Sequence, residues 1–301
     1  MSDELKVSVA VFRIQHYSAF SEFADHVGGF VAEAKQSGSR VIVLPEFLAM
    51  GLLWTDSEAA SIDNTKVSDF YRKVFNPLFG EFKSLMSALS VKHDIYIVGG
   101  TFWHEENGKG LNSGFVFRPD GSHLRQDKLH LTRGERAIHS SPGESLSSFE
   151  IDGIKCGTFV CYDVQYPELT QFLVAEGTEV LFVPTLTEVR GAWRSWYSAH
   201  ARALENQMFV CVAPLVGNLG IPNDYPVSGT GEAFVACPID NRMKVDDGTY
   251  AVSDFSEGDE GLIHATLDLA SLRLSREKGE VRHLKDRRPD LYRSLYDQID
   301  N

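Results

Sequence analysis

Glu46, Lys128 and Cys161 have side chains that could together carry out nucleophilic catalysis. Each closes a short run with the composition of a β-strand: VIVLPE, HLRQDK and GTFVC. A thiol attacks as its thiolate, and at a pKa of about 8.5 little of it is ionised at neutral pH, so it needs a base and a favourable charge environment. A carboxylate could supply the base and an ammonium group the positive charge. Since ligands in α/β sheets commonly bind at the carboxyl ends of strands, these three ends are candidates for one site.

Each of these residues also has a purely structural interpretation. A charged side chain at a strand end is usually solvated, and an isolated cysteine is more often a buried structural thiol than a nucleophile. We assign that structural role to Cys156, Cys211 and Cys237. With four cysteines and no C-x-x-C pair, we expect free thiols rather than a disulfide framework or a zinc ribbon.

Other common chemistries lack their sequence motifs. The chain has no G-x-S-x-G elbow, no G-x-G-x-x-G, no G-x-x-x-x-G-K and no H-E-x-x-H, the patterns typical of serine hydrolases, nucleotide-binding proteins and zinc proteases. The ten histidines show no metal-ligand spacing. We therefore expect no metal ion and no organic cofactor.

Composition narrows the class of protein and its partners. A chain of 301 residues with 43% hydrophobic content is typical of one large globular α/β domain. The formal net charge of −13 argues against a nucleic-acid partner. The start, MSDELK, lacks the basic and then apolar pattern of a signal peptide, and nowhere do about eighteen apolar residues follow one another. These features predict a cytoplasmic protein without a membrane partner.

The periodicity of apolar residues alternates between strand-like and helix-like. We predict hairpin turns at 118–121 and 152–153. Loops rich in Gly, Pro, Ser and charge are expected at 104–111, 132–146, 217–231 and 244–260. The predicted strands are 6–14, 41–46, 95–103, 180–185, 209–214, 232–238 and 262–269, and the predicted helices are 20 to about 38, 67–91, 167–176 and 192–207.

This order of elements predicts mixed sheets with helices packed outside, rather than a purely parallel barrel. Alternation along KCGTFVC puts Gly157, Phe159 and Cys161 on one face of a strand. If that strand ends at Cys161, its thiol points into the crevice at the carboxyl end.

The motifs VIVLPE, QDKLHL, TRGERA and GTFVCYDVQYPEL, in this order, resemble those of the nitrilase, or carbon-nitrogen hydrolase, superfamily. The resemblance extends to RALENQMFV, GTGEAF and DRRPDLY, and so covers nearly the whole chain. It implies an α/β fold, a four-layer α-β-β-α sandwich, whose subunits commonly pair as homodimers or higher homo-oligomers. It also implies that Glu46 is the general base, Lys128 the cationic stabiliser and Cys161 the nucleophile, with Glu135 as an additional loop glutamate.

The same groups suggest a mechanism and a substrate class. Cys161 would attack an amide carbonyl, and the resulting oxyanion would be held by Lys128 and the backbone N–H of Tyr162. Amidase-like branches of the superfamily usually carry Tyr-Asp after the cysteine, as here, so the resemblance favours a small carboxamide as substrate. Nitrile and N-carbamoyl hydrolysis are the alternatives on this fold. A non-catalytic scaffold is disfavoured because the four site residues are all present. The hypothesis of an acyltransferase has less support than either of these alternatives.

Aromatic and basic residues near the presumed strand ends are candidates for the substrate pocket. The aromatic candidates are Phe47, Trp54, Tyr166 and Trp193, with Trp196 nearby; Arg133, Arg190 and Arg194 could recognise a substrate carboxylate. We predict a hydrolase domain at 1–273. The polar segment 274–301 is predicted to be a C-terminal arm that is solvated or docks on a partner subunit.

Overall fold

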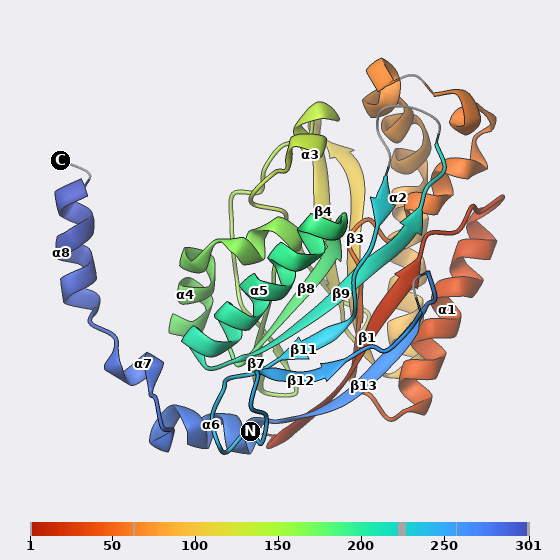
Figure 1. Ribbon diagram of the computed structural model, residues 1–301. Coiled ribbons are helices and arrows are strands. Elements are labelled where there is room, and N and C mark those ends of the chain that lie inside the picture. Colours follow the sequence, from red (N-terminus) through yellow and green to blue (C-terminus); the bar gives the residue numbers. More distant parts are fainter. Residues whose placement is uncertain (1, 63, 222–226, 257, 300–301) are drawn as a thin grey trace.

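The computed structural model describes residues 2–62, 64–221, 227–256 and 258–299 (Figure 1). The described strands form one strongly curled mixed sheet, in which two halves meet along β1 (Glu4–Arg13) and β9 (Phe209–Asn218). The parallel pairing between the halves is short: Phe12 lies opposite Leu215, and Arg13 opposite Val216. The sheet folds over on itself along this pairing of β1 with β9.

The first half is built around three parallel strands: β1, β2 (Val41–Leu44) and β3 (Tyr96–Glu106). Antiparallel strands extend it on both sides. β4 (Lys109–Phe117) and β5 (His123–Asp127) follow β3, and β13 (Gly261–Asp268) pairs with β1.

The second half repeats this arrangement. β7 (Ile154–Thr158), β8 (Val180–Leu186) and β9 are parallel, and β6 (Phe149–Ile151) is antiparallel to β7. β11 (Phe234–Ala236) and β12 (Thr249–Val252) extend it antiparallel beside β9, and the short β10 (Ser228–Gly229) pairs with the end of β9.

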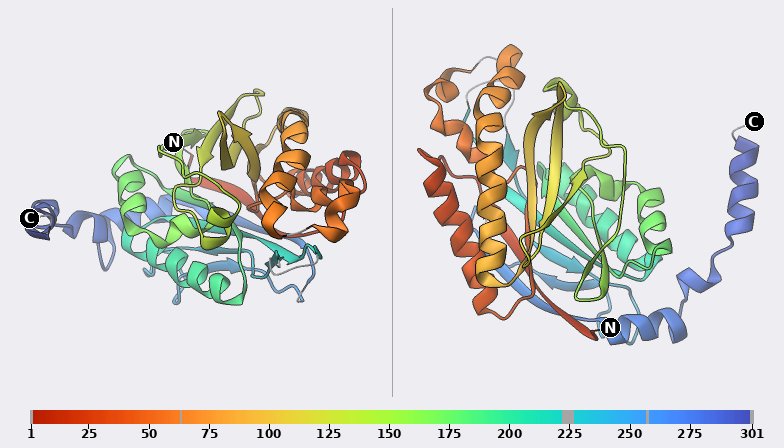
Figure 2. Two further views of the ribbon diagram at one scale, coloured as in Figure 1. Left: turned by 90° about the horizontal axis from the view of Figure 1, so that it is seen from above. Right: turned by 180° about the vertical axis from the view of Figure 1, so that it is seen from behind.

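Helices cover the outer face of each half, which completes four layers (Figure 2). α1 (Phe20–Gln36) and α2 (Val67–His93) cover the first half, with the short helices η1 (Met50–Thr55), η2 (Ser57–Ser61) and η3 (Asn64–Lys66) between them. α4 (Pro167–Ala175) and α5 (Val189–Asn206) cover the second half. A separate core fills the space between the two sheet halves, where Val9 and Val43 share a cluster with Phe182 and Cys211. The predicted α-β-β-α sandwich with mixed sheets is confirmed.

Most predicted elements occur within a few residues of their expected bounds, but several details were wrong. The second strand ends at Leu44 because Pro45 has no N–H to donate. The expected loop 104–111 is the tight turn of the β3–β4 hairpin, with Asn107 (φ 52°) and Gly108 (φ 76°) both left-handed, as an Asn-Gly turn requires. The short helix α3 (Arg133–Ala137) interrupts the expected loop 132–146, and β12 lies in 244–260. Residues 222–226 and 257 of the last two predicted loops lie outside the described residues.

The chain leaves the sandwich through its C-terminal segment. α6 (Leu269–Lys278) spans the predicted domain boundary and packs on the body: the Arg273 guanidinium donates to both Glu179 carboxylate oxygens, at 2.7 and 2.9 Å. α7 (His283–Asp286) still contacts the end of α5, where the Leu284 N–H donates to Gln207 Oε1 at 3.3 Å, and α8 (Pro289–Ile299) then extends away from the body (Figures 1 and 2). In the described part of the chain no helix is both long and apolar enough to cross a membrane.

Candidate active site

The structure brings Glu46, Lys128 and Glu135 into direct contact, with Cys161 beside them. Lys128 Nζ donates to Glu46 Oε1 at 2.7 Å and to Glu135 Oε2 at 2.6 Å. Glu46 Oε2 accepts from the backbone N–H of Leu186 at 2.9 Å, and the Cys161 Sγ lies 3.8 Å from the Leu186 carbonyl oxygen. All four side chains are nearly or fully buried. One ammonium group therefore lies between two carboxylates, and the thiol and Glu46 share a backbone neighbour.

A bulge in β3 fixes the position of Glu46. The pairing of β3 with β4 shifts register between Val98 and Thr101, and at Gly100 (φ 64°) an added Cβ would come within 1.9 Å of the Pro45 carbonyl oxygen. Thr101 then forms two hydrogen bonds with the turn after β2. Its Oγ1 accepts from the Phe47 N–H at 2.8 Å, and its N–H donates to the Pro45 carbonyl oxygen at 3.3 Å. Only glycine tolerates this combination of left-handed backbone and close approach.

Lys128 and Glu135 are held by the segment that follows β5. Glu135 is the third residue of α3 and forms a capping box with Thr132, whose N–H and Oγ1 donate to Glu135 Oε2 at 3.0 and 2.8 Å. The same carboxylate oxygen that completes the cap receives the Lys128 ammonium. The helix cap therefore aims Glu135 at Lys128.

Cys161 occupies a sharp turn rather than the end of a strand. β7 stops at Thr158, and Cys161 has a left-handed backbone (φ 48°) as it opens the short helix η4 (Cys161–Gln165). A non-glycine residue in this region is strained by about 1 to 3 kcal/mol and is often found at functional sites. The expectation that the strand runs to Cys161 was wrong. The thiol is nevertheless placed over the end of β8 at Leu186.

Asp163 joins the Cys161 turn to the segment that carries Lys128. One carboxylate oxygen accepts from the His130 N–H at 2.8 Å and from His130 Nδ1 at 3.0 Å. The other accepts from the N–H groups of Leu129 at 3.2 Å and Val160 at 3.3 Å. One nearly fully buried side chain thus ties the residues after Lys128 to the residue before Cys161.

Burial and charge shift the pKa values of the site in different directions. Burial, together with the neighbouring Glu46 carboxylate, raises the pKa of the Cys161 thiol well above its usual value. Burial also raises the pKa of Glu46, against the opposing pull of Lys128. For Glu135 burial acts in the same sense, but Lys128 and hydrogen bonds from Asn112 and Thr132 outweigh it, so its pKa is lowered. Two carboxylates with diverging pKa values are suited to different roles, one accepting and returning a proton and one staying ionised.

The lysine is held in its charged form. Burial alone would lower the pKa of Lys128, but Glu46 and Glu135 dominate and raise it well above its usual value. The resting site therefore contains a neutral thiol beside a permanent cation. Such a thiol reacts when a base removes its proton as the new bond forms.

Asn112 is a member of this cluster that the sequence analysis missed. It lies on β4, and its Nδ2 donates to Glu46 Oε1 at 2.9 Å and to Glu135 Oε1 at 2.8 Å. The available signal was an asparagine within LNSGFVF, since a strand buried on both faces rarely carries a polar side chain without a partner.

The predicted pocket residues lie in different surroundings. Phe47 directly follows Glu46 and has a left-handed backbone (φ 52°). Tyr166 stacks on His130 at 3.6 Å between ring centroids, beside the segments that carry Lys128 and Cys161. Trp54 donates its indole N–H to the Leu219 carbonyl at 2.7 Å. Trp193 is 58% exposed on the outer side of α5, next to Tyr197.

The remaining candidates are peripheral. Trp196 packs against Phe234, with 4.5 Å between ring centroids. Arg133, Arg190 and Arg194 are exposed. Cys156, Cys211 and Cys237 are buried free thiols, as predicted.

Comparison with known proteins identifies the family. The carbon-nitrogen hydrolase family matches residues 8–277. The probable hydrolase YhcX of Bacillus subtilis is 30% identical over 306 residues, which cover 97% of this chain and 55% of YhcX, so the chain spans about half the length of that relative. The omega-amidase NIT2 of Danio rerio is 28% identical over 282 residues, 89% of this chain and 91% of NIT2.

The solved structures agree with the family match. Saccharomyces cerevisiae Nit3, a member of branch 10 of the nitrilase superfamily, has a TM-score of 0.72 at 22% identity, over 92% of this chain and 94% of Nit3. The four-layer fold is therefore that of the nitrilase superfamily. The chain belongs to the carbon-nitrogen hydrolase family, whose members hydrolyse carbon–nitrogen bonds.

Proposed function

We propose that this enzyme hydrolyses a small carboxamide to a carboxylic acid and ammonia through a thioester on Cys161. The observation that carries the proposal is the contact of the Lys128 ammonium with both Glu46 and Glu135, next to a thiol that shares Leu186 with Glu46. The proposed base, cation and nucleophile therefore lie in one buried cluster.

In the first half of the proposed reaction, Glu46 removes the thiol proton as the Cys161 sulfur attacks the amide carbon. The raised pKa of Cys161 supports this order, because a thiol that stays neutral at rest needs a base during attack. Lys128 and the backbone N–H of Tyr162 stabilise the oxyanion. Tyr162 lies in the first turn of η4, where backbone N–H groups have no acceptor within the helix.

The tetrahedral intermediate then collapses to the thioester. Glu46 returns its proton to the departing nitrogen, the carbon–nitrogen bond breaks, and ammonia leaves. The ionised Glu46 next takes a proton from a water molecule that attacks the thioester carbonyl. The carbon–sulfur bond breaks, Cys161 recovers its proton, and the carboxylic acid is released. The raised pKa of Glu46 suits a group that accepts and returns a proton in each half-reaction.

An amide substrate is favoured over a nitrile by two features. The residues after the nucleophile are Tyr162 and Asp163, and the Danio rerio relative is named an omega-amidase. A substrate confined by Phe47, which follows Glu46 in the chain, and by Tyr166, which stacks on His130, would be small.

The test measures ammonia release from a panel of small carboxamides, N-carbamoyl compounds and nitriles. We expect release from carboxamides by the wild type and a loss of at least about 1,000-fold in Cys161→Ala, because removing a nucleophile removes the covalent route. Cys237→Ala is the matched control, since it removes a buried thiol elsewhere and should keep turnover. A Cys161→Ala variant that remains active would refute the nucleophile, and exclusive turnover of nitriles or N-carbamoyl compounds would refute the substrate class.

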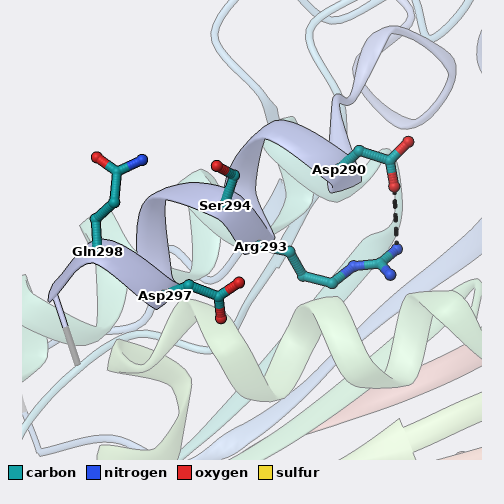
Figure 3. A pocket seen from close by; sticks show the side chains of 5 residues that line it. All are labelled: Asp290, Arg293, Ser294, Asp297 and Gln298. Atoms are coloured by element: carbon teal, nitrogen blue, oxygen red, sulfur yellow. Dashed lines mark hydrogen bonds and ion pairs between the residues drawn. The ribbon is translucent and has the colours of Figure 1, made fainter. Parts of the chain in front are cut away.

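We also propose that the enzyme works as a homodimer or higher homo-oligomer. Val189, Trp193 and Tyr197 are spaced four residues apart on α5 and form an exposed apolar stripe. On α8, Leu291, Tyr292, Leu295 and Tyr296 are likewise exposed. Figure 3 shows the polar side chains of the same helix, among them Asp290 and Arg293, which form an ion pair at 3.3 Å. An amphipathic helix held away from its own body supports a role for the arm in contacting a second copy.

A further inference from the structure

We propose that Asn112 is a positioning residue that holds the Glu46 and Glu135 carboxylates in place on either side of Lys128. This inference deepens the proposed function and rests on it for its catalytic meaning. Asn112 touches no substrate in this scheme, and it acts through the three charged groups around it.

Asn112 is bonded to each of these three residues. Its side-chain Nδ2 donates to Glu46 Oε1 at 2.9 Å and to Glu135 Oε1 at 2.8 Å, and its backbone oxygen accepts from the Lys128 N–H at 3.0 Å. The residue comes from β4, whereas Glu46 follows β2 and Lys128 follows β5. It therefore links the ends of two strands through a third.

The chemistry of the partners fixes the orientation of the Asn112 amide. An ionised carboxylate can only accept hydrogen bonds, so both partners require the nitrogen rather than the oxygen to face them. Both hydrogens of the amide are used in this way. Within the described residues Asn112 Oδ1 is buried and has no hydrogen-bond partner. The side chain is thus anchored entirely through its donors, and its bonds to the carboxylates account for its presence in the interior.

Lys128 and Asn112 stabilise the Glu46 and Glu135 carboxylates in different ways. The ammonium contributes one positive charge between two negative ones, which leaves the buried cluster with an excess negative charge when both carboxylates are ionised. Two N–H donors from Asn112 stabilise that charge without adding a proton that can dissociate. The hydrogen bond from Asn112 is one cause of the lowered pKa of Glu135.

Removal of this amide therefore has a signature that depends on pH. If Asn112 stabilises ionised carboxylates, its loss raises their pKa values in the folded state. A variant with raised folded pKa values binds protons more readily when folded, so it loses stability relative to the wild type at high pH and regains it as pH falls. An asparagine that merely fills space would produce the same loss at every pH.

The experiment compares urea unfolding of wild type and Asn112→Leu between about pH 5 and about pH 8. Leucine has a similar size and no donor. We expect the variant-to-wild-type ratio of unfolding constants to be at least about threefold larger at pH 8 than at pH 5, because the pKa of Glu46 is already raised by burial and rises further when the Asn112 donor is lost. A ratio independent of pH would overturn the proposal. If Asn112→Leu does not fold, Asn112→Ser, which keeps one donor, takes its place with the same criterion.

Ser90→Ala is the control for a buried hydrogen bond that involves no ionised group. The Ser90 hydroxyl donates to the Ile95 carbonyl at 2.7 Å, and its loss should change stability equally across the pH range. Wild-type ammonia release reports separately on the proposed function. If the ratio varies with pH but the protein releases no ammonia, Asn112 keeps its positioning role and the proposed amidase function is rejected. If the protein releases ammonia but the ratio is independent of pH, the amidase function is kept and the positioning role of Asn112 is rejected.

Discussion

At the scale of single residues, the free energy of the site depends on one buried cation. Glu46 is 1% and Glu135 3% exposed, and both bond to Lys128. Two carboxylates buried together are tolerated because the ammonium, the Asn112 amide and backbone N–H groups compensate for lost hydration. The same arrangement makes the cluster sensitive to the loss of any one positive or donating group.

We predict that Lys128→Met, which keeps the length of the side chain and removes its charge, destabilises the protein by about 3 to 5 kcal/mol at neutral pH, because it leaves buried carboxylates unpaired. Without the cation, their folded pKa values rise above the unfolded value of about 4.3. The folded variant then binds more protons than the unfolded chain, so part of the loss is recovered as pH falls through the raised pKa values.

Urea unfolding at about pH 5 and about pH 8 measures both parts of this prediction. The control is Lys155→Met, which removes an exposed pair with Glu150 at 3.7 Å and should change stability by less than about 1 kcal/mol. A Lys128→Met variant whose stability matches the control at both pH values would mean that the buried charges are solvated in solution.

At the scale of elements, sequence periodicity located most strands and helices. Each outer helix has one buried face and each central strand has two buried faces, and both arrangements leave a recognisable pattern of apolar residues. The resemblance named Glu46, Lys128, Cys161 and Glu135, which lie close together in the structure. What periodicity could not supply was the backbone conformation between elements. The left-handed turn at Cys161 depends on Asp163 and on contacts with the segment after β5, which lies far away in the sequence.

The place of Asn112 in the cluster could not be predicted from the sequence for a related reason. Its partners are carboxylates from other elements, and a single asparagine in a strand carries no local pattern that names them. Gly100 could be recognised as unusual within VGGTFW. Glycine is required there because the Pro45 carbonyl oxygen lies too close for a side chain, which the sequence of β3 alone does not reveal.

We predict that Asp163→Asn weakens the link between the Cys161 turn and the Lys128 segment. Asparagine retains one acceptor oxygen, so the N–H donors that bond to the other oxygen of Asp163 lose their acceptor in a buried site. Each orphaned donor costs about 1 to 3 kcal/mol. Displacement of the thiol from Glu46 should also lower kcat/KM on the best substrate by at least about tenfold.

Unfolding free energy and kcat/KM measured on the same preparations test the two effects. Asp152→Asn is the matched control: Asp152 pairs with Arg40 at the surface and occupies a left-handed turn position that asparagine accepts. If Asp163→Asn keeps the kcat/KM of the control, the Asp163 link has no part in placing the proposed nucleophile, Cys161.

At the scale of the whole molecule, the two sheet halves bury the faces that carry the site, while one helix face and the arm remain uncovered. The α5 stripe of Val189, Trp193 and Tyr197 lies opposite the buried side of the helix, which packs on the second half of the sheet. Two adjacent aromatic rings on an exposed helix face are typical of a protein interface, since aromatic residues provide much of the binding free energy.

We predict that the wild type sediments as a dimer or larger assembly of the 33.5 kDa chain, and that Trp193→Glu combined with Tyr197→Glu raises the dissociation constant at least about 100-fold. The reason is that two interface aromatics typically contribute several kcal/mol, and a buried carboxylate would add a desolvation cost. Sedimentation velocity over a range of concentrations measures the change. Val91→Glu places the same charge at an exposed apolar position of α2 and should leave the assembly intact. A wild type that is monomeric at every concentration would contradict the proposed assembly, and an assembly unaffected by the double substitution would place its interface elsewhere than α5.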